Sequence, residues 1–307
     1  MLALLTSSAD PGAELKEAPD PEPVHDEAVV KVEAVSLNRG EVRALTTKPP
    51  GSLTGWDVAG VVERPAADGS GPAEGARVVG LHTEGWAERA AVPTKDLAVL
   101  PDEVTFAQAA CLPVAGLTGL LALEIAGNVL GRRVLITGAS GGVGRIAVQL
   151  AHRSGAHVTG VSASPERARG LTDLGADEVI HDLAPEGPKF DVVVEGVGGA
   201  SLGAALQRIE VDGAIVSFAS SDPSPTEFPA RAFFRGAPGS SLYGLFVFHE
   251  IDKRGGAGLS LSRLAALVAA GELDTQIDLE VSWRETGDAI RALTDRKIAG
   301  KAVLHID

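Results

Sequence analysis

The chain has 307 residues, of which 45% are hydrophobic and 22% are charged, and this length suffices for one large or two medium globular domains. Its 41 acidic and 27 basic residues give a net charge of −14, which repels phosphate backbones and argues against nucleic acid as a partner. A single cysteine excludes an internal disulfide and any zinc site built on several thiolates.

The sequence carries no signal for membrane insertion or export. Its most apolar stretch, residues 109–125, is interrupted by Pro113, Gly116 and Glu124, which makes it unsuited to spanning a bilayer. The first residues, MLALLT, lack the positive charge of a signal peptide. We therefore expect a cytoplasmic protein with no membrane partner.

The first 110 residues resemble short strands joined by turns. Partly alternating apolar segments at 28–35, 58–63 and 77–80 are separated by proline and glycine clusters at 49–51 and 68–72. This pattern predicts a compact β-rich unit.

From about residue 130 onwards, expected strands and helices alternate. The strands are predicted at 133–137, 157–161, 178–180, 191–194 and 214–218, and the helices at 143–153, 165–174, 199–209 and 259–270. A last strand is predicted at 301–306. Alternating strands and helices imply right-handed crossovers, so this part of the chain predicts a parallel, doubly wound α/β sheet.

The strongest motif is TGASGGVG at 137–144, between an apolar strand and a helix. Glycines let the backbone approach a pyrophosphate, and the start of the helix supplies free N–H groups. Because the motif lies inside a strand–helix–strand unit, a dinucleotide-binding loop is favoured over glycines that serve packing alone.

The residues after the second predicted strand indicate which dinucleotide binds. NAD sites usually have an acidic residue there, whereas this chain has Ser162, followed by Arg167. A hydroxyl and a guanidinium suit a 2′-phosphate, so NADPH is expected in preference to NADH, unless Arg167 is an ordinary surface residue. Asp182, after the third strand, argues the other way, because its carboxylate would repel a 2′-phosphate.

A short-chain dehydrogenase would begin with this loop and would use a tyrosine followed four residues later by a lysine. Here the loop starts near residue 137, and the only tyrosine, Tyr243, is followed at that spacing by Val247. The short-chain class is therefore excluded.

Other motifs, taken in order, resemble a different family. They are VSLN at 35–38, GWDVAGVV at 55–62, GWAE at 85–88, LPVAGLT at 112–118, LGA at 174–176 and GKAVL at 300–304. With the glycine-rich loop, they are similar to the zinc-free quinone oxidoreductase (zeta-crystallin-like) branch of the medium-chain dehydrogenases and reductases. The resemblance implies an α/β fold, with a Rossmann doubly wound parallel sheet domain at 113–272 and a β-rich GroES-like catalytic domain formed by 1–112 and 273–307.

The resemblance also bears on metals. Zinc-dependent relatives bind a catalytic zinc through Cys, His and Cys, at positions that correspond here to Asn38, Trp56 and Val114. None of these three is a usual zinc ligand, and the seven histidines are not paired at helical spacing. Cys111, in an apolar segment, is expected to be a small buried residue. No metal is expected.

Without zinc to polarise a carbonyl, the substrate must already accept hydride well, as a quinone or an activated C=C bond of an enone or enal does. The resemblance thus implies an NADPH-dependent oxidoreductase of small molecules. The source of the proton stays open among Asn38 as an oxyanion donor, Tyr243 as a proton donor, and bulk water, which ranks first. Trp56 could stack on an aromatic quinone or pack in the domain core. Asn38, Trp56 and Tyr243 are the candidate catalytic residues.

The resemblance also implies the cofactor contacts. Thr118 would lie near the nicotinamide, the loop after 139 would hold the pyrophosphate, and residues after the fourth and fifth strands would border the ribose and the nicotinamide. The predicted contacts are Thr118, Ser140, Gly141, Gly142, Val143, Ser162, Arg167, Val197, Gly198, Phe218, Ala219 and Ser220.

The segment 240–248 resembles the strand that pairs with its twin in dimeric relatives, which predicts a homodimer, although an internal edge strand would show the same pattern. Two other functions remain open. One is an enoyl reductase of a biosynthetic pathway, which uses the same hydride chemistry. The other is an NADPH-binding protein without turnover, serving as a redox sensor or a structural protein.

Overall fold

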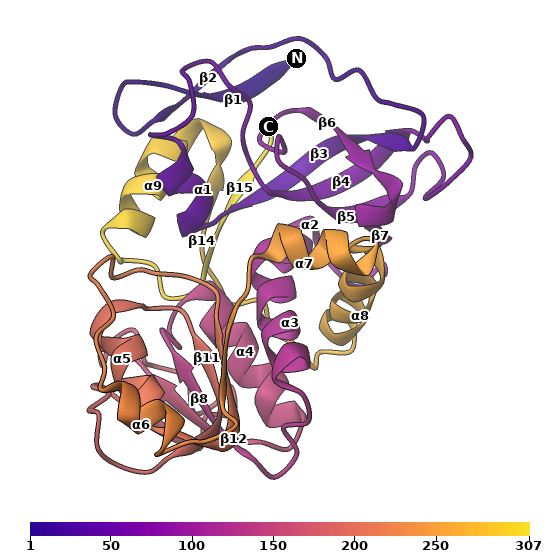
Figure 1. The fold of residues 1–307 in the computed structure, drawn as a ribbon. Coiled ribbons are helices and arrows are strands. Elements are labelled where there is room, and N and C mark those ends of the chain that lie inside the picture. The colour runs from indigo at the N-terminus through magenta and orange to yellow at the C-terminus, as the bar shows by residue number, and fades with distance from the viewer. The chain divides into compact units, whose positions relative to one another are not determined.

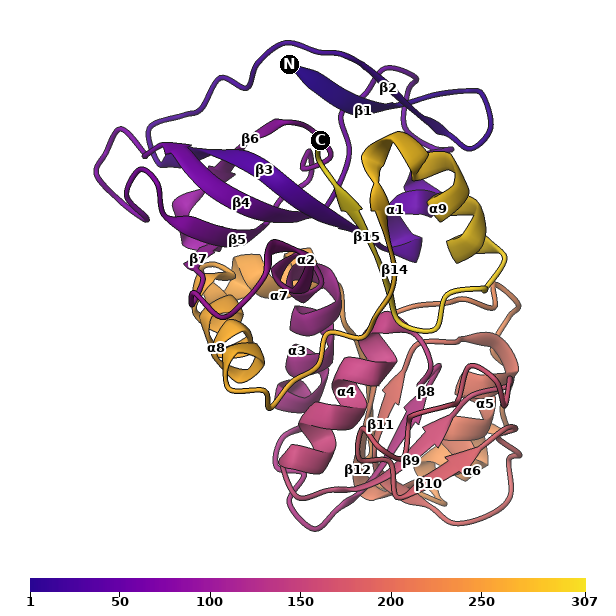
Figure 2. The same ribbon diagram turned by 180° about the vertical axis from the view of Figure 1, so that it is seen from behind.

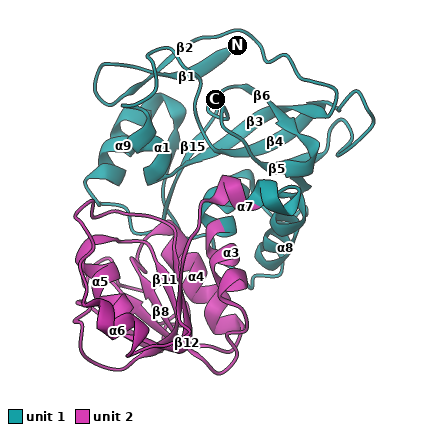
Figure 3. Ribbon diagram, viewed as in Figure 1, with its two compact units in different colours: residues 1–117, 251–307 teal, residues 118–250 magenta.

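The computed structural model describes residues 1–307 and divides the chain into two compact units (Figure 3). Unit 1 comprises Met1–Leu117 and Ile251–Asp307, and unit 2 comprises Thr118–Glu250. Residues 113–117 and 251–272, which the sequence analysis assigned to the nucleotide-binding domain, thus lie in unit 1. The second of these segments contains helix α8 (Gly258–Ala269), which packs against strands β5 (Arg77–Leu81) and β7 (Leu97–Val99) of unit 1.

Unit 2 is built on a six-stranded parallel sheet. Its strands are β8 (Arg133–Thr137), β9 (His157–Val161), β10 (Glu178–Ile180), β11 (Phe190–Glu195), β12 (Ile209–Ser217) and β13 (Ser241–Gly244). They lie in the order β10-β9-β8-β11-β12-β13, and every neighbouring pair is parallel. Numbered from β8, this is the order 3-2-1-4-5-6 of a dinucleotide-binding doubly wound sheet. The predicted fold class of this part is confirmed.

Helices cover both faces of the sheet in unit 2. Helix α4 (Gly142–Arg153) lies on one face, whereas α5 (Gly199–Gln207) and α6 (Ala230–Phe234) lie on the other (Figures 1 and 2). Helix α3 (Leu117–Ala126) packs beside α4, since a Cβ atom at Gly119 would lie 3.4 Å from the main-chain nitrogen of Ala147. The core under α5 contains apolar side chains of the sheet and the helix, such as Leu135, Phe190, Val193, Leu206 and Ile215.

Two predicted elements of unit 2 are wrong. Residues 165–174 form a series of turns instead of a helix, and Gly170 lies within them at a φ of 78°, which a right-handed helix does not accommodate. The predicted strand over 240–248 is shorter, because β13 ends at Gly244 and helix α7 (Val247–Arg254) begins three residues later. In contrast, β8, β9 and β10 have the predicted bounds.

Unit 1 is β-rich, as predicted. The hairpin of β1 (Leu2–Thr6) and β2 (Ala13–Glu17) forms a separate sheet. The main sheet has the order β14-β15-β3-β4-β5-β7, and β6 pairs with β3. Its further strands are β3 (Glu27–Leu37), β4 (Asp57–Arg64), β6 (Arg89–Pro93), β14 (Ile277–Ser282) and β15 (Lys301–His305). Because β15 pairs antiparallel with the end of β3, the last strand of the chain lies against the residues just before Asn38.

Short helices surround this sheet. They are α1 (Arg39–Ala44), α2 (Phe106–Ala110), the π-helical turn η2 (Leu112–Gly116), α8 and α9 (Thr286–Thr294), with 3-10 turns η1 (Thr94–Asp96) and η3 (Trp283–Glu285). The indole rings of Trp86 and Trp283 are buried in the core of unit 1. In neither unit does a helix combine the length and the apolar character needed to cross a membrane.

Candidate active site

The glycine-rich loop of unit 2 joins β8 to α4 and leaves the start of α4 uncapped. Gly138 has a φ of 60°, and Gly141, which precedes the helix, places no side chain on its first turn. A Cβ atom at Gly144 would lie 2.4 Å from the carbonyl oxygen of Gly138, so only glycine fits there. A Cβ atom at Gly141 would approach only that oxygen, at 3.4 Å. The free N–H groups and the open space at Gly141 fit a pyrophosphate.

A buried carboxylate fixes the turn after β11. Glu195 accepts hydrogen bonds from the N–H groups of Val197 (2.9 Å) and Gly198 (3.0 Å). The hydroxyl of Thr137, at the end of β8, donates to the same carboxylate at 3.1 Å. Charge-assisted bonds therefore hold together the ends of β8 and β11, where the strand order reverses and sheets of this type bind ligands.

The end of β12 lies against the same turn. The ring of Phe218 occupies the space beside Gly196, where a Cβ atom would come within 2.3 Å of Cζ. The N–H group of Asp222 donates to the carbonyl oxygen of Val197 at 2.7 Å. The structure thus brings together two predicted cofactor-binding segments, Val197 with Gly198 and Phe218 with Ala219 and Ser220.

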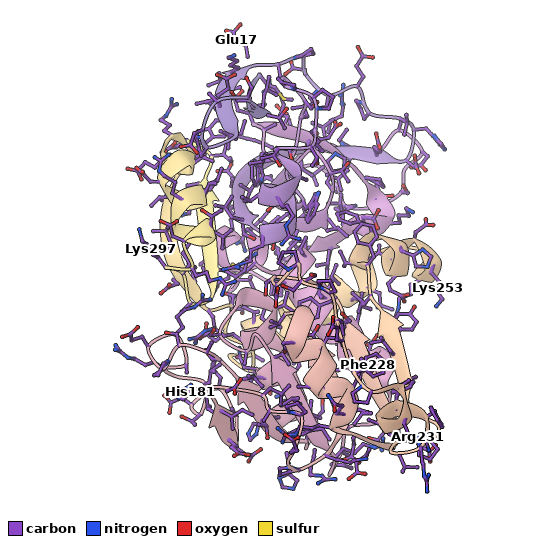
Figure 4. All side chains as sticks on the ribbon, turned by 60° about the vertical axis from the view of Figure 1, so that its left-hand side comes forward. Glu17, His181, Phe228, Arg231, Lys253 and Lys297 are labelled. Atoms are coloured by element: carbon purple, nitrogen blue, oxygen red, sulfur yellow. The ribbon has the colours of Figure 1, made fainter.

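Ser162 and Arg167 lie in the segment that follows β9. The buried hydroxyl of Ser162 donates to the carbonyl oxygen of Ser164 at 3.2 Å, and the N–H group of Arg167 donates to Oγ of Ser164 at 3.3 Å. The carbonyl oxygen of Ser162 lies 2.8 Å from Nδ1 of His181, which is at one side of unit 2 (Figure 4). Ser164 is therefore a common anchor for the two predicted residues, and the exposed Asp182 follows His181.

Thr118 is buried in the first turn of α3. The helix packs against α4, the helix that carries the glycine-rich loop at its start. Thr118 and the loop are therefore held by the same pair of helices.

Tyr243 lies on the edge strand β13 and is half-buried. Its hydroxyl donates a hydrogen bond to the carboxylate of Glu250, which is itself buried on α7. A role for Tyr243 as a proton donor would require this hydrogen bond to open.

Four buried polar side chains of unit 1 make up what we call the polar cluster: Asn38, Glu41, Asp57 and Lys301. Nζ of Lys301 donates to Oδ1 of Asn38 at 2.6 Å and lies 3.6 Å from Oδ2 of Asp57. Nδ2 of Asn38 donates to Asp57 at 2.6 Å and to Oε1 of Glu41 at 3.1 Å. The amide of Asn38 is thus engaged on both its oxygen and its nitrogen within this polar cluster.

The polar cluster also shifts a protonation equilibrium. Burial, reinforced by the charge of Asp57, raises the pKa of Glu41 to about 8, although Lys301 and hydrogen bonds from the main chain of Asn38 and Trp56 act in the opposite direction. Glu41 therefore changes its charge near neutral pH, unlike an ordinary carboxyl group.

The polar cluster holds two further main-chain segments. The N–H group of Trp56 donates to Oε2 of Glu41, and the N–H group of Val114 donates to Oδ1 of Asp57, both at 2.8 Å. The half-buried ring of Trp56 lies against Gly40, where a Cβ atom would be 2.8 Å from Cζ3. The positions of Asn38, Trp56 and Val114, far apart in the sequence, therefore meet around two carboxylates.

The comparisons with known proteins agree with this arrangement. Residues 142–255 match the family described as zinc-binding dehydrogenase. The chain is 31% identical over 314 residues to the chloroplastic quinone-oxidoreductase QR1 of Triphysaria versicolor, which covers 94% of this chain and 92% of the relative. It is 30% identical over 310 residues to the 2-methylene-furan-3-one reductase of Solanum lycopersicum, covering 93% of this chain and 73% of the relative.

A solved structure gives the same result for the fold. A mycobacterial protein in complex with NADPH superposes with a TM-score of 0.87 at 25% identity, covering 100% of both chains. The chain belongs to the zinc-free quinone oxidoreductase branch of the medium-chain dehydrogenases and reductases. The family predicted from the motifs is confirmed, as is the two-domain fold class.

In this oxidoreductase, the three positions predicted to correspond to the zinc ligands of zinc-dependent relatives carry an amide, an indole and an isopropyl side chain. No group of three or more His, Cys, Asp or Glu side chains is gathered where it could hold a metal ion. The nearby Cys111 is buried, its thiol lies 3.4 Å from the carbonyl oxygen of Ala107, and burial raises its pKa to about 12. Its thiol is therefore uncharged at neutral pH.

Sequence reasoning missed several polar residues of the oxidoreductase. Glu195 and Asp57 each lie at an end of a strand, and Lys301 begins an apolar strand, so each resembles an ordinary boundary residue. His82 was also missed: its main-chain N–H group donates to the carbonyl oxygen of Trp56 at 2.9 Å, and burial lowers the pKa of its imidazole to about 4. A charged residue adjoining a continuous apolar run was the available signal.

Proposed function

We propose that this protein is an NADPH-dependent reductase that transfers hydride to a quinone or to an activated C=C bond without a metal. The observation that carries the proposal is the arrangement at the carboxyl ends of the parallel strands in unit 2. There, an uncapped glycine-rich helix start, the turn held by Glu195 and the Ser162–Arg167 segment follow three neighbouring strands. This is the edge at which sheets of this order bind dinucleotides.

The preference for NADPH is supported by the segment after β9. Arg167 offers a guanidinium, and Ser162 stands where a carboxylate would select NADH by binding the ribose hydroxyls. The mycobacterial structural relative was solved with NADPH, which supports the same choice.

The cofactor and the protein would have different roles in the reaction. Bound NADPH supplies the hydride, whereas the protein binds and orients the reactants. Ser140, Gly141, Gly142 and Val143 would hold the pyrophosphate through the start of α4. Thr118, Val197, Gly198, Phe218, Ala219 and Ser220 would fix the nicotinamide half.

Two of the predicted catalytic residues, Asn38 and Trp56, belong to unit 1. Trp56 offers a half-buried ring suited to an aromatic quinone, and Asn38 would act mainly through the polar cluster that holds Trp56, because its amide is already engaged. Since the hydroxyl of Tyr243 is directed at Glu250, water is the favoured source of the proton.

The class of acceptor is supported by the two curated relatives. One is named a quinone oxidoreductase and the other reduces a methylene-furanone, which is an activated alkene. Turnover of a panel of small quinones, enones and enoyl thioesters with NADPH would identify the class. Turnover of thioesters alone would favour an enoyl reductase, and cofactor binding without any turnover would favour a sensor.

We also propose a homodimer formed along β13. This strand is at the edge of its sheet, and Leu242 within it is 47% exposed. Phe246, two residues after the strand ends, is 61% exposed. Exposed apolar side chains on an unpaired strand edge favour pairing with a second copy.

The direct test of the proposed function is a fluorescence titration with NADPH and, in parallel, with NADH. We expect tight binding of NADPH and weak binding of NADH. In the Arg167→Glu variant, NADPH binding should weaken by at least about tenfold, the equivalent of one charge-assisted hydrogen bond, with little change for NADH. Equal effects on the two nucleotides would contradict the assignment of Arg167 to the 2′-phosphate. Binding of neither nucleotide by the wild type would refute the proposed function.

A further inference from the structure

Arg145 is a buried cation whose role the motif does not explain. It is the fourth residue of α4, directly after the glycine-rich loop, and only 5% of its surface is exposed. A guanidinium stays charged in almost any protein environment, so burying one is costly unless hydrogen bonds replace the lost water. The bonds that Arg145 makes therefore indicate what it stabilises.

The guanidinium of Arg145 links two separate segments of unit 2. Its Nη2 donates to the carbonyl oxygens of Arg167 and Arg169, each at 2.9 Å. Its Nε lies 3.4 Å from the carbonyl oxygen of Ser140 and donates to it. Ser140 belongs to the glycine-rich loop, and the two other acceptors belong to the turns after β9. One planar side chain thus connects both segments.

The turns after β9 depend on side chains for their shape. Residues 165–174 form neither helix nor strand, and Gly170 interrupts them at a φ of 78°. Within this segment, Ser164 accepts from the N–H group of Arg167, and Arg145 holds the carbonyl oxygen of the same residue. The main chain of Arg167 is therefore fixed on both sides, by Ser164 and by Arg145.

We propose that Arg145 is a positioning residue that sets the preference of this protein for NADPH over NADH. By bridging Ser140 and the main chain at 167 and 169, it fixes Arg167 and Ser162 relative to the loop that would hold the pyrophosphate. The spacing between the two phosphate-binding segments is then built in before the cofactor arrives, which saves the free energy of ordering the turns upon binding. This inference rests on the proposed function.

The test compares the affinities of NADPH and NADH in three variants by fluorescence titration. Arg145→Met removes the bridge, Arg145→Lys keeps the charge but loses the planar fork, and Arg153→Met removes an exposed arginine at the other end of the same helix. We expect both Arg145 variants to weaken NADPH binding by about tenfold and NADH binding by less than about threefold, and the control to resemble the wild type.

Two outcomes would overturn the proposal. If Arg145→Met weakened both nucleotides equally, Arg145 would only support the fold. If Arg145→Lys kept the wild-type ratio of affinities, the positive charge at position 145 would suffice for the preference, and the hydrogen-bonded bridge would not be needed.

A double-mutant cycle tests whether Arg145 acts through Arg167. Because it compares the ratio of the two affinities, a partial loss of stability that weakens both nucleotides does not affect it. In an Arg167→Met background, the further change Arg145→Met should alter the NADPH-to-NADH ratio by less than about twofold, because the residue being positioned is gone. Full additivity would contradict the proposal. A wild type that binds neither nucleotide would refute the proposed function, whereas a wild type that prefers NADPH while its Arg145 variants keep that preference would refute this inference alone.

Discussion

Lys301 brings a positive charge to two buried carboxylates from a position very distant in the chain. Its ammonium group lies 3.6 Å from Asp57, donates to Asn38 and also donates to the carbonyl oxygen of Leu37 at 3.0 Å. In a low-dielectric interior, such a group offsets repulsion between neighbouring carboxylates. The polar cluster therefore depends on this residue for its charge balance.

Removing this charge should destabilise unit 1. We expect Lys301→Met to lower the free energy of unfolding by about 3–5 kcal/mol, because Asp57 would remain buried without its cationic partner. The matched control is Lys297→Met, since the Lys297 side chain is 72% exposed and its ion pair with Asp295 is worth at most about 1 kcal/mol. Denaturant unfolding measures both. Similar small losses in the two variants would contradict the role given to Lys301.

Glu41 predicts a pH dependence of stability. Its pKa rises from 4.5 in the unfolded chain to about 8 in the folded protein, so the folded protein binds this proton more tightly. Its contribution to stability is therefore greatest below 4.5 and declines as the pH rises to about 8.

The Glu41→Gln variant cannot titrate, so its unfolding free energy should vary less over that pH interval than the wild-type value. Glu17→Gln, a change at an exposed carboxyl group of unit 1 (Figure 4), should keep the wild-type profile. An unchanged slope in Glu41→Gln would show that another group titrates.

At the scale of elements, the start of α4 separates the needs of the fold from those of the cofactor. A Cβ atom at Gly144 would collide with the main chain of Gly138 and Ala139, whereas one at Gly141 would meet ordinary contact distances only. Packing therefore requires glycine at position 144, whereas we propose that Gly141 leaves room for the cofactor.

Two alanine variants test this separation. We expect Gly144→Ala to lower the free energy of unfolding by about 1–3 kcal/mol through overpacking, and to lose nucleotide binding with it. Gly141→Ala should leave stability almost unchanged while weakening NADPH binding by at least about tenfold, because its methyl group would occupy the space of the pyrophosphate. Thermal unfolding and titration together decide. NADPH binding by Gly141→Ala at wild-type strength would exclude a pyrophosphate at this loop.

At the scale of the whole molecule, the exposed edge of β13 predicts an association state. We expect sedimentation of the wild type as a dimer, and Leu242→Glu should shift it toward a monomer by placing a charge in the proposed interface. Leu259→Glu is the control, since Leu259 is 78% exposed on α8 and belongs to unit 1, whereas β13 belongs to unit 2. A wild-type monomer at all concentrations would contradict the proposal.

The sequence predicted the parallel sheet well because the signals there are local. A continuous apolar run marks β8, and the glycine-rich motif marks the start of α4. The helix predicted at 165–174 was wrong, because the apparently helical pattern contains Gly170, whose positive φ is decided by the surrounding structure. The strand predicted to continue over 245–248 was wrong, because Phe246 and Phe248 resemble strand residues but lie on either side of Val247, where α7 begins.

The polar contacts could not be predicted, because they join residues that are distant in the sequence. Asn38 was selected for its position in a motif, but nothing near it in the chain indicates that its amide would be engaged by Asp57 and Lys301. Arg145 was likewise not selected, because the motif and the apolar pattern account for its helix without indicating that its side chain would bond to residues 167 and 169. Local patterns define elements, whereas the partners of buried polar groups depend on how those elements pack.

The pairing of β15 with β3 has a consequence for synthesis on the ribosome. Lys301 and Asn38 are 263 residues apart, and the whole of unit 2 is translated between them. The continuous chain of unit 2 can therefore fold while it emerges, whereas β3 can pair with β4 and β6 but not yet with β15. Until Lys301 has emerged, Asp57 lacks its cation, so chaperones that bind nascent chains have a long opportunity on the amino-terminal segment.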